Sequence, residues 1–79
     1  MSNTALFVVE TKTAKFKRMD GYQCRGKSPA SVLVHLQYHF QRKVVDKATG
    51  QKRLVPYYNL SELEKGHKDH KIRIVWMGE

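Results

Sequence analysis

The hydrophobic positions near the start of the chain form a continuous run rather than an alternation. Residues 5–11 are rich in β-branched and aromatic side chains and are apolar on both faces of a pleat, which is typical of an inner strand. Residues 14–19 place Phe16 between Lys15 and Lys17, and this alternation predicts a second strand. We therefore expect strands over 5–11 and 14–19.

The pair Asp20-Gly21 separates the second predicted strand from the β-prone residues 22–25. Asp-Gly is a strong signal for a two-residue hairpin of type I′, because that turn needs positive φ at both central residues. The pattern predicts a hairpin with residues 22–25 as the returning strand. One long bulged strand over 14–26 is the alternative.

A helical period begins at Ser28-Pro29, where a hydroxyl N-cap precedes a proline at the first helical position. The period predicts a helix over residues 29–42. Its apolar stripe consists of Val32, Leu33, Leu36 and Phe40, and its opposite face carries Ser31, His35, Tyr38 and Arg42.

Two β-branched runs follow the helix and flank a short loop that contains Asp46 and Gly50. They predict a hairpin over residues 44–55 with Gly50 in a left-handed conformation. The alternative is that the helix continues through Val45 and only the second run is a strand. Pro56 cannot donate to a ladder, so we expect the second strand of this hairpin at a sheet edge.

The last quarter of the chain predicts a helical turn and a strand. Ser61 and Glu64 have the spacing of a capping box, which indicates a single short turn ended by Gly66. Residues 71–77 alternate, and their apolar positions share one face, so we expect a final strand that Trp76 anchors in the core.

The order of elements indicates the α+β class. We expect a single compact domain over residues 1–79. In it, one amphipathic helix (about 29–42) packs on a mainly antiparallel sheet of four to five short strands.

Length and composition exclude several classes of protein. A 79-residue chain buries only about 60 % of its unfolded surface, which disfavours a large catalytic cleft. The single cysteine cannot form an internal disulfide, so the chain is compatible with a reducing cytoplasm, where we expect it. The longest apolar run, residues 5–9, is far shorter than the roughly 20 residues that span a bilayer. We therefore expect no association with a membrane.

The charge is strong and unevenly placed. The formal net charge is +8, from 15 basic and 7 acidic residues. Residues 1–53 hold eleven of the basic and three of the acidic residues, whereas residues 54–79 hold four of each. A lopsided basic segment indicates an acidic partner, since net charge bears on partners rather than on fold.

Metal binding and catalysis both have candidate residues but no matching motif. The histidine pairs His35/His39 and His67/His70, with Cys24 as a possible thiolate, fit no zinc spacing. Cys24 also lacks a nucleophile–base motif around it, although nearby cations could lower its pKa. We expect no metal, no cofactor, no small-molecule substrate and no enzymatic activity.

The remaining signal is a basic surface interleaved with aromatic residues. Lysine and arginine neutralise phosphates, and tyrosine can stack on an unpaired base. We expect this surface to bind nucleic acid, a nucleoprotein or an acidic protein surface. The candidate binding residues are Lys15, Lys17, Arg18, Arg25, Lys27, His35, Tyr38, Arg42, Lys43, Lys52 and Arg53.

A second class of function uses the same surface on a protein. The chain is similar in size and layout to accessory proteins of phages and mobile elements, which inhibit a host enzyme or defence complex by protein–protein binding. Interfaces of that kind favour aromatic and methionine anchors. The candidates here are Tyr22, Tyr57, Tyr58 and Met77.

Overall fold

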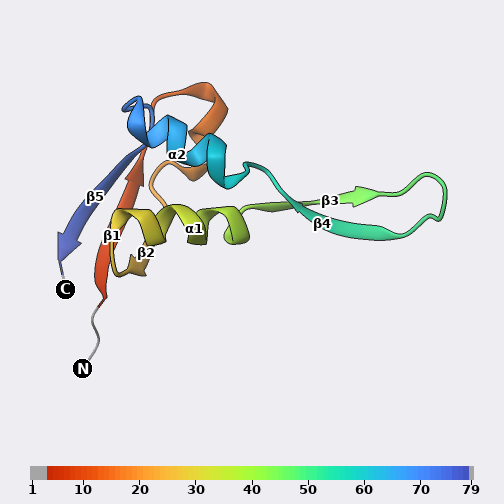
Figure 1. Ribbon diagram of the computed structural model, residues 1–79, viewed down its shortest axis with the longest axis horizontal. Helices are drawn as coiled ribbons and strands as arrows, with labels where there is room; N and C mark the ends of the chain where they lie inside the picture. The colour runs from red at the N-terminus through yellow and green to blue at the C-terminus, as the bar shows by residue number, and fades with distance from the viewer. Residues whose placement is uncertain (1–3, 79) are drawn as a thin grey trace.

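The strands form two separate antiparallel sheets in a computed structural model that describes residues 4–78 (Figure 1). The first sheet has the order β2-β1-β5, and the second is the hairpin β3–β4. Together with the helices, these five strands confirm the predicted α+β class. The elements in chain order are β1 (Ala5–Glu10), the 3-10 helix η1 (Ala14–Met19), β2 (Gln23–Gly26), α1 (Pro29–His39), β3 (Gln41–Val45), β4 (Lys52–Pro56), α2 (Leu60–Lys68) and β5 (Arg73–Gly78).

The core lies on one face of the three-stranded sheet. β1 is the central strand, as predicted, and its residues Phe7 and Val9 point into the core. Leu6 and Val8 on the opposite face are only half-buried. Both α-helices and η1 contribute to the single buried cluster, which consists of Phe7, Val9, Phe16, Met19, Val32, Leu33, Leu36, Tyr58, Leu63 and Ile72.

The prediction of a strand over 14–19 is wrong, because this segment is the 3-10 helix η1. The three-residue spacing of Phe16 and Met19 puts both side chains on one face of such a helix, where both are buried. Tyr58 holds the segment in place: its hydroxyl donates to the Lys15 carbonyl (2.7 Å), and its ring lies 5.3 Å from that of Phe16. The alternative of one strand over 14–26 is wrong for the same reason.

The Asp20-Gly21 turn exists, but it is not of type I′ and joins η1 to β2. Asp20 is extended (φ −61°, ψ 128°) and Gly21 has φ +84°. With the bond from the Tyr22 N–H to the Met19 carbonyl (3.1 Å), this is type II geometry, which needs a positive φ only at the second central residue. The returning strand β2 pairs with β1 instead.

Helix α1 begins as predicted and ends earlier than expected. Ser28 is the N-cap and forms a capping box with Ser31, and Pro29 is the first helical residue. The helix ends at His39, because Phe40 leaves the helical region and its carbonyl accepts from the Tyr57 N–H (2.9 Å). Arg42 therefore lies in β3, and its predicted place on the outer face of the helix is wrong.

The hairpin prediction is confirmed, and the alternative of a helix through Val45 is wrong. β3 and β4 pair from Gln41 opposite Pro56 to Val45 opposite Lys52. Gly50 is left-handed (φ +72°). Pro56 ends an edge strand, since each strand of a two-stranded sheet has a free edge.

The capping box at Ser61 is not the start of α2, which is longer than the single turn predicted. Asn59 is the N-cap, and its side-chain oxygen accepts from the Glu62 N–H (2.8 Å). Gly66 lies inside the helix rather than at its end. A β-carbon at Gly66 would lie 3.0 Å from both the Phe16 ring and Ile72, so close packing requires glycine there.

Trp76 does not anchor the core, contrary to the prediction. The expected alternation holds for Ile72 and Ile74, which are buried and half-buried, but Trp76 is 60 % exposed. Among residues 4–78, β5 is an edge strand that pairs with β1 alone, and Figure 1 shows it running from α2 to the periphery of the molecule. Within residues 4–78, no helix has both the length and the apolar character needed to cross a bilayer.

Met19 distinguishes the 3-10 helix from the strand expected from the sequence. In a strand with Phe16 inward, Met19 would face outward, whereas in η1 it is fully buried. We predict that Met19→Ala lowers the free energy of unfolding by about 2–5 kcal/mol, as measured by urea denaturation. Lys17→Ala, at an exposed position of η1, serves as the control with an expected change within about 0.5 kcal/mol. Equal effects of the two changes would contradict the burial of Met19.

Candidate nucleic-acid interface

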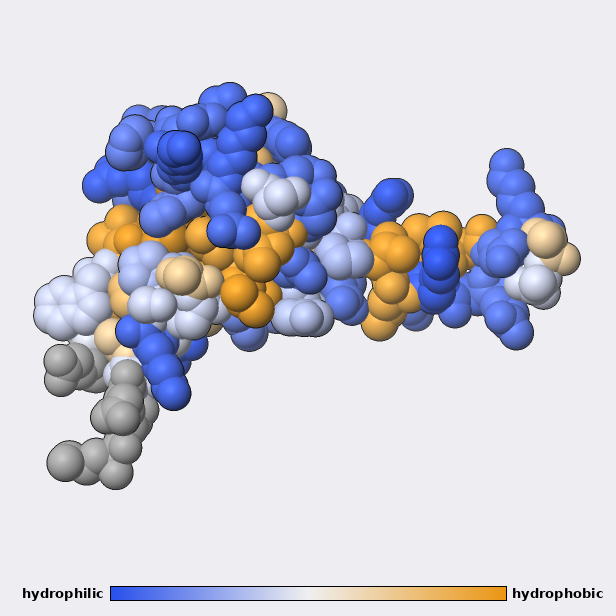
Figure 2. Space-filling view, in the orientation of Figure 1, coloured by the Kyte–Doolittle hydropathy of each residue, from blue (hydrophilic) through white to orange (hydrophobic). Residues whose placement is uncertain are grey.

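The hairpin β3–β4 projects from the body of the protein as a narrow arm (Figure 1). The space-filling view shows hydrophobic and hydrophilic side chains mixed along it and hydrophilic ones around its end (Figure 2). The arm carries one carboxylate, Asp46, and five cations. These cations, which we call the arm cations, are Arg42, Lys43, Lys47, Lys52 and Arg53.

The register of the hairpin pairs a cation with an apolar residue at four successive positions. Arg42 is opposite Val55, Lys43 is opposite Leu54, Arg53 is opposite Val44, and Lys52 is opposite Val45. Directly opposed residues share a face of the ribbon, and successive residues alternate between faces.

Each face of the arm therefore presents two cations on one diagonal and two apolar side chains on the other. One face carries the arginines Arg42 and Arg53, and the other carries the lysines Lys43 and Lys52. All four are exposed. Both faces of the arm therefore carry positive charge.

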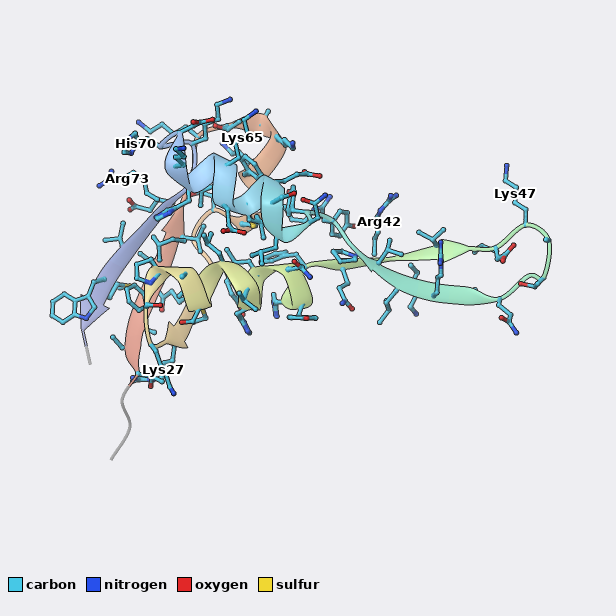
Figure 3. The ribbon with its side chains drawn as sticks, viewed as in Figure 1. Lys27, Arg42, Lys47, Lys65, His70 and Arg73 are labelled. Atoms are coloured by element: carbon cyan, nitrogen blue, oxygen red, sulfur yellow. The ribbon has the colours of Figure 1, made fainter. Side chains whose placement is uncertain are left out.

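The tip of the arm is a well-defined loop. The Asp46 carboxylate accepts from the Ala48 N–H (2.8 Å), and the Asp46 carbonyl accepts from the Gly50 N–H (2.7 Å). The Asp46 N–H in turn donates to the Gln51 carbonyl (2.8 Å). These three hydrogen bonds of Asp46 close the loop. Lys47 lies at the far end of the arm (Figure 3).

A further cation lies at the root of the arm. The Arg18 guanidinium lies 4.1 Å from the centre of the Tyr57 ring, within the range of a cation–π contact. Tyr57 directly follows β4, and its N–H bonds to Phe40 just before β3. Arg18, predicted from the sequence as a binding residue, is therefore brought to the arm by tertiary structure.

The other predicted binding residues belong to other elements than the arm. Lys15 forms an ion pair with Glu62 (3.1 Å), so its charge is partly compensated, and Lys17 is exposed on the same helix η1. Arg25 lies on β2, and Lys27 lies in the segment before α1. Figure 3 shows Lys27 and Lys47 at opposite ends of the long axis. The predicted basic residues thus do not form one continuous surface.

His35 and Tyr38 are both exposed on α1, but His35 belongs to an aromatic cluster. The Tyr22 hydroxyl and the His35 Nε2 are 2.7 Å apart, and the Tyr22 and His39 rings stack at 4.4 Å. Burial, and to a lesser degree the charge of Cys24, raises the pKa of Tyr22. This cluster gives His35 a structural contact rather than a free ring.

The residues considered for metal binding and catalysis do not gather into one site, although the rings of His35 and His39 lie 5.6 Å apart. Within the described part of the chain, no group of three or more histidine, cysteine, aspartate or glutamate side chains could hold a metal ion. Cys24 is half-buried and packs against the core. Burial raises the pKa of its thiol, which is opposite to the shift that activates a cysteine nucleophile.

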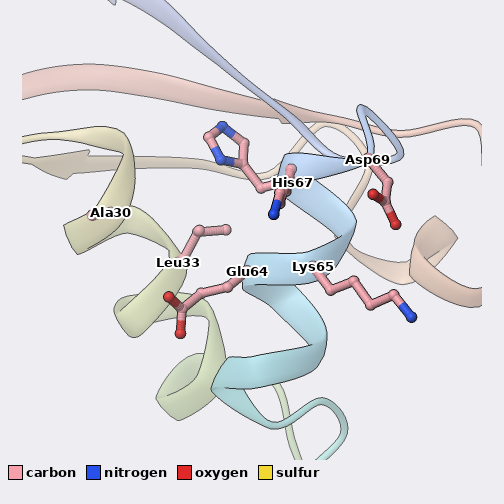
Figure 4. Close-up of a pocket in the computed structure, with 7 residues that line it drawn as sticks. Ala30, Leu33, Glu64, Lys65, His67 and Asp69 are labelled. Atoms are coloured by element: carbon pink, nitrogen blue, oxygen red, sulfur yellow. The ribbon is translucent and has the colours of Figure 1, made fainter.

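A groove between α1 and α2 lies on the body (Figure 4). Leu33 of α1 faces α2 in it, while Glu64, Lys65 and Asp69 contribute charges of both signs. Its mixed charge does not extend the positive field of the arm.

Comparison with known proteins gives no relative from which a function could be transferred. No protein-family model, no curated protein and no solved structure matches the chain. The function is therefore inferred from the geometry and chemistry of the chain's own residues.

Two residues of the arm were missed by the sequence interpretation. Leu54 is 59 % exposed and Val45 is 54 % exposed, on the same face as the arm's two paired lysines. The sequence carries a signal for this exposure, because in each β-run two adjacent cations precede two adjacent apolar residues, so each strand gives each face one cation and one apolar side chain. That pattern leaves neither face of the hairpin apolar enough to enter a core.

We predict that the Cys24 thiol reacts slowly with an alkylating reagent. Because burial raises its pKa, the thiolate is depleted near neutral pH, and the midpoint of the alkylation rate against pH is expected above that of a free cysteine. Gln23→Cys combined with Cys24→Ser moves the thiol to an exposed neighbouring position and is expected to restore an ordinary midpoint. A lower midpoint for Cys24 than for this control would contradict its assignment as a structural residue.

Proposed function

We propose that the protein is a non-enzymatic module that binds duplex DNA through the arm β3–β4. The observation that supports this proposal is the projecting ribbon with exposed cations on both faces. A two-stranded ribbon fits the B-DNA major groove, which is about 12 Å wide. Five paired positions at about 3.4 Å each give a ribbon of roughly 17 Å.

The charges of the arm suit a polyanion. A ribbon in a groove lies between two phosphate walls, so long cationic side chains from either face can reach phosphates. Phosphate contacts of this kind supply most of the affinity of non-specific DNA binding. Arg18 and Tyr57 at the root of the arm would lie where the duplex meets the body.

The exposed apolar side chains of the arm have a role in the same proposal. Val45 and Leu54 would otherwise be an unexplained solvent-exposed pair. In a groove they can contact thymine methyl groups or sugar edges, which are apolar surfaces of DNA. Double-stranded RNA is a poorer fit, because its major groove is deep and narrow.

Salt dependence tests the electrostatic part of the proposal. We predict that affinity for a random-sequence DNA duplex falls with a log–log slope of about −0.9 per neutralised phosphate, or roughly −4 to −5 for the five arm cations. Fluorescence anisotropy over a salt series measures the slope. Undetectable binding at low ionic strength would refute the proposal, and equal affinity for duplex RNA would refute its assignment to DNA.

Paired charge reversals test the location of the site. Arg42→Glu with Arg53→Glu is expected to weaken DNA binding at least about tenfold and to reduce the salt slope by about 2. Arg25→Glu with Lys27→Glu changes the net charge equally at the other end of the molecule and is expected to leave most of the affinity and slope. Circular dichroism checks that both variants fold. Equal losses in the two variants would show that overall charge, and not the arm, determines binding.

Binding to an acidic protein surface is the second candidate function. The exposed pair Val45 and Leu54 favours it, because apolar residues on a projecting arm can also anchor a protein interface. Tyr58, one of the anchors considered from the sequence, is buried and is not available. Under this alternative, the arm would capture a protein from a nuclease-treated lysate, and Leu54→Ser would abolish the capture.

A further inference from the structure

The outer edge of β5 is unpaired in the described residues. The sheet order β2-β1-β5 places β5 at an edge, with β1 as its only strand neighbour among residues 4–78. An edge strand presents backbone N–H and carbonyl groups that can pair with another chain. The outer edge of β5 can therefore form backbone hydrogen bonds with a strand of another chain.

The chain protects both strands of the arm with charges, whereas the central residues of β5 carry none, and the register of β5 against β1 shifts only near its end, between the pairs Phe7–Trp76 and Leu6–Gly78. β4 contains two cations and ends in Pro56, and β3 contains two cations, all devices that discourage edge pairing. Residues 74–77 of β5 are Ile, Val, Trp and Met without a charge. Trp76 is 60 % exposed and Met77 is 50 % exposed, so both faces of β5 carry a large uncovered apolar side chain.

The alternation of backbone hydrogen bonds along β1 shows which backbone groups of β5 point to its free edge. The Val9 N–H donates to the Tyr22 carbonyl, and the Val9 carbonyl accepts from the Gly21 N–H, so the backbone of Val9 faces away from β5. Alternation turns Val8 towards β5, where it is opposite Val75. Val75 therefore bonds to β1, and the N–H and carbonyl groups of Ile74 and Trp76 point to the free edge.

We propose that β5 is a self-association site, where two copies of the chain pair antiparallel through this edge about a two-fold axis at Val75. In this register Ile74 of each copy is opposite Trp76 of the other, so the outward-facing groups of both residues exchange hydrogen bonds. Such an isologous contact closes on itself and yields a dimer. The pairing joins the three-stranded sheets of the two copies into one continuous sheet of six strands.

The side chains match in the same register. On the core face, each exposed Trp76 covers the half-buried Ile74 of the second copy. On the opposite face, Met77 lies beside the aliphatic stem of the second copy's Arg73, whose charge is partly compensated by Glu10 in its own chain (3.7 Å). The pairing thus buries both exposed side chains of β5 without burying an unpaired charge.

The placement of the arm cations limits the repulsion between two copies, although each chain has a net charge of +8. β5 and the arm lie at opposite ends of a molecule about 47 Å long (Figure 1). The arms of the two copies therefore point away from each other, separated by several Debye lengths at physiological salt, each about 8 Å. This inference does not depend on what the arm binds.

Sedimentation of the full chain without nucleic acid tests the dimer. The mass is expected to rise with concentration from 9.2 kDa towards twice that value over about 10 µM to 1 mM. Trp76 is the only tryptophan, so its emission is expected to shift to shorter wavelengths over the same range. Trp76→Lys is expected to keep the chain monomeric, whereas Leu54→Lys, at an equally exposed position of the arm, is expected to leave dimerisation intact.

Engineered thiols test the register. In a Cys24→Ser background, Val75→Cys places two thiols at a non-hydrogen-bonded pair on the two-fold axis, where the α-carbons are about 4.5 Å apart, within disulfide range. Met77→Cys is the matched control in the same strand. Its thiols would be four residues out of register, about 13 Å apart, and are expected not to crosslink despite their greater exposure.

Three results would overturn the proposal. A chain that remains monomeric at about 1 mM has no β5 dimer of useful affinity. A dimer that persists in Trp76→Lys uses another surface. Crosslinking at position 77 that equals or exceeds crosslinking at position 75 excludes the two-fold axis at Val75.

Discussion

The structure depends on a single hydrophobic core, which lies on one face of the three-stranded sheet, because a small chain can bury only a limited fraction of its surface. The core lies between the Phe7 and Val9 face of β1 and the layer formed by α1, α2 and η1. At its centre Gly66 lets the Phe16 ring and Ile72 approach the α2 backbone closely. Segments beyond this layer, the arm and the outer end of β5, have no partner within the described chain and keep their apolar side chains in contact with solvent.

The exposure of these two segments has different consequences because their compositions differ. In the arm, a cation is opposite an apolar residue at four successive positions, so both faces are amphipathic, which supports the proposed binding of a polyanion. In β5, residues 74–77 have no charge, so the edge suits a strand of similar character. One small core thus separates an electrostatic surface from a hydrophobic one at opposite ends of the molecule (Figure 1).

Tertiary contacts also explain why the candidate site differs from the surface expected from the sequence. Arg18 was expected on a strand beside Lys15 and Lys17, but the turn of η1 stacks it on Tyr57 at the root of the arm. Arg42 was expected on the helix and lies on the arm, because the Phe40 carbonyl bonds to the Tyr57 N–H and ends the helical period. Both displacements result from contacts between residues far apart in the chain, which local patterns do not encode.

Local chemistry was sufficient to predict the elements whose signals are contained in a few neighbouring residues. The inner strand β1, the Ser28 cap with Pro29, and the left-handed Gly50 of the arm all follow from side-chain and backbone preferences within a few residues. Only the tertiary structure decided that residues 14–19 form a 3-10 helix, that Gly66 lies inside α2, and that Trp76 lies outside the core. In these cases the same apolar pattern fits two conformations, and the space available in a small core determines which side chains are buried.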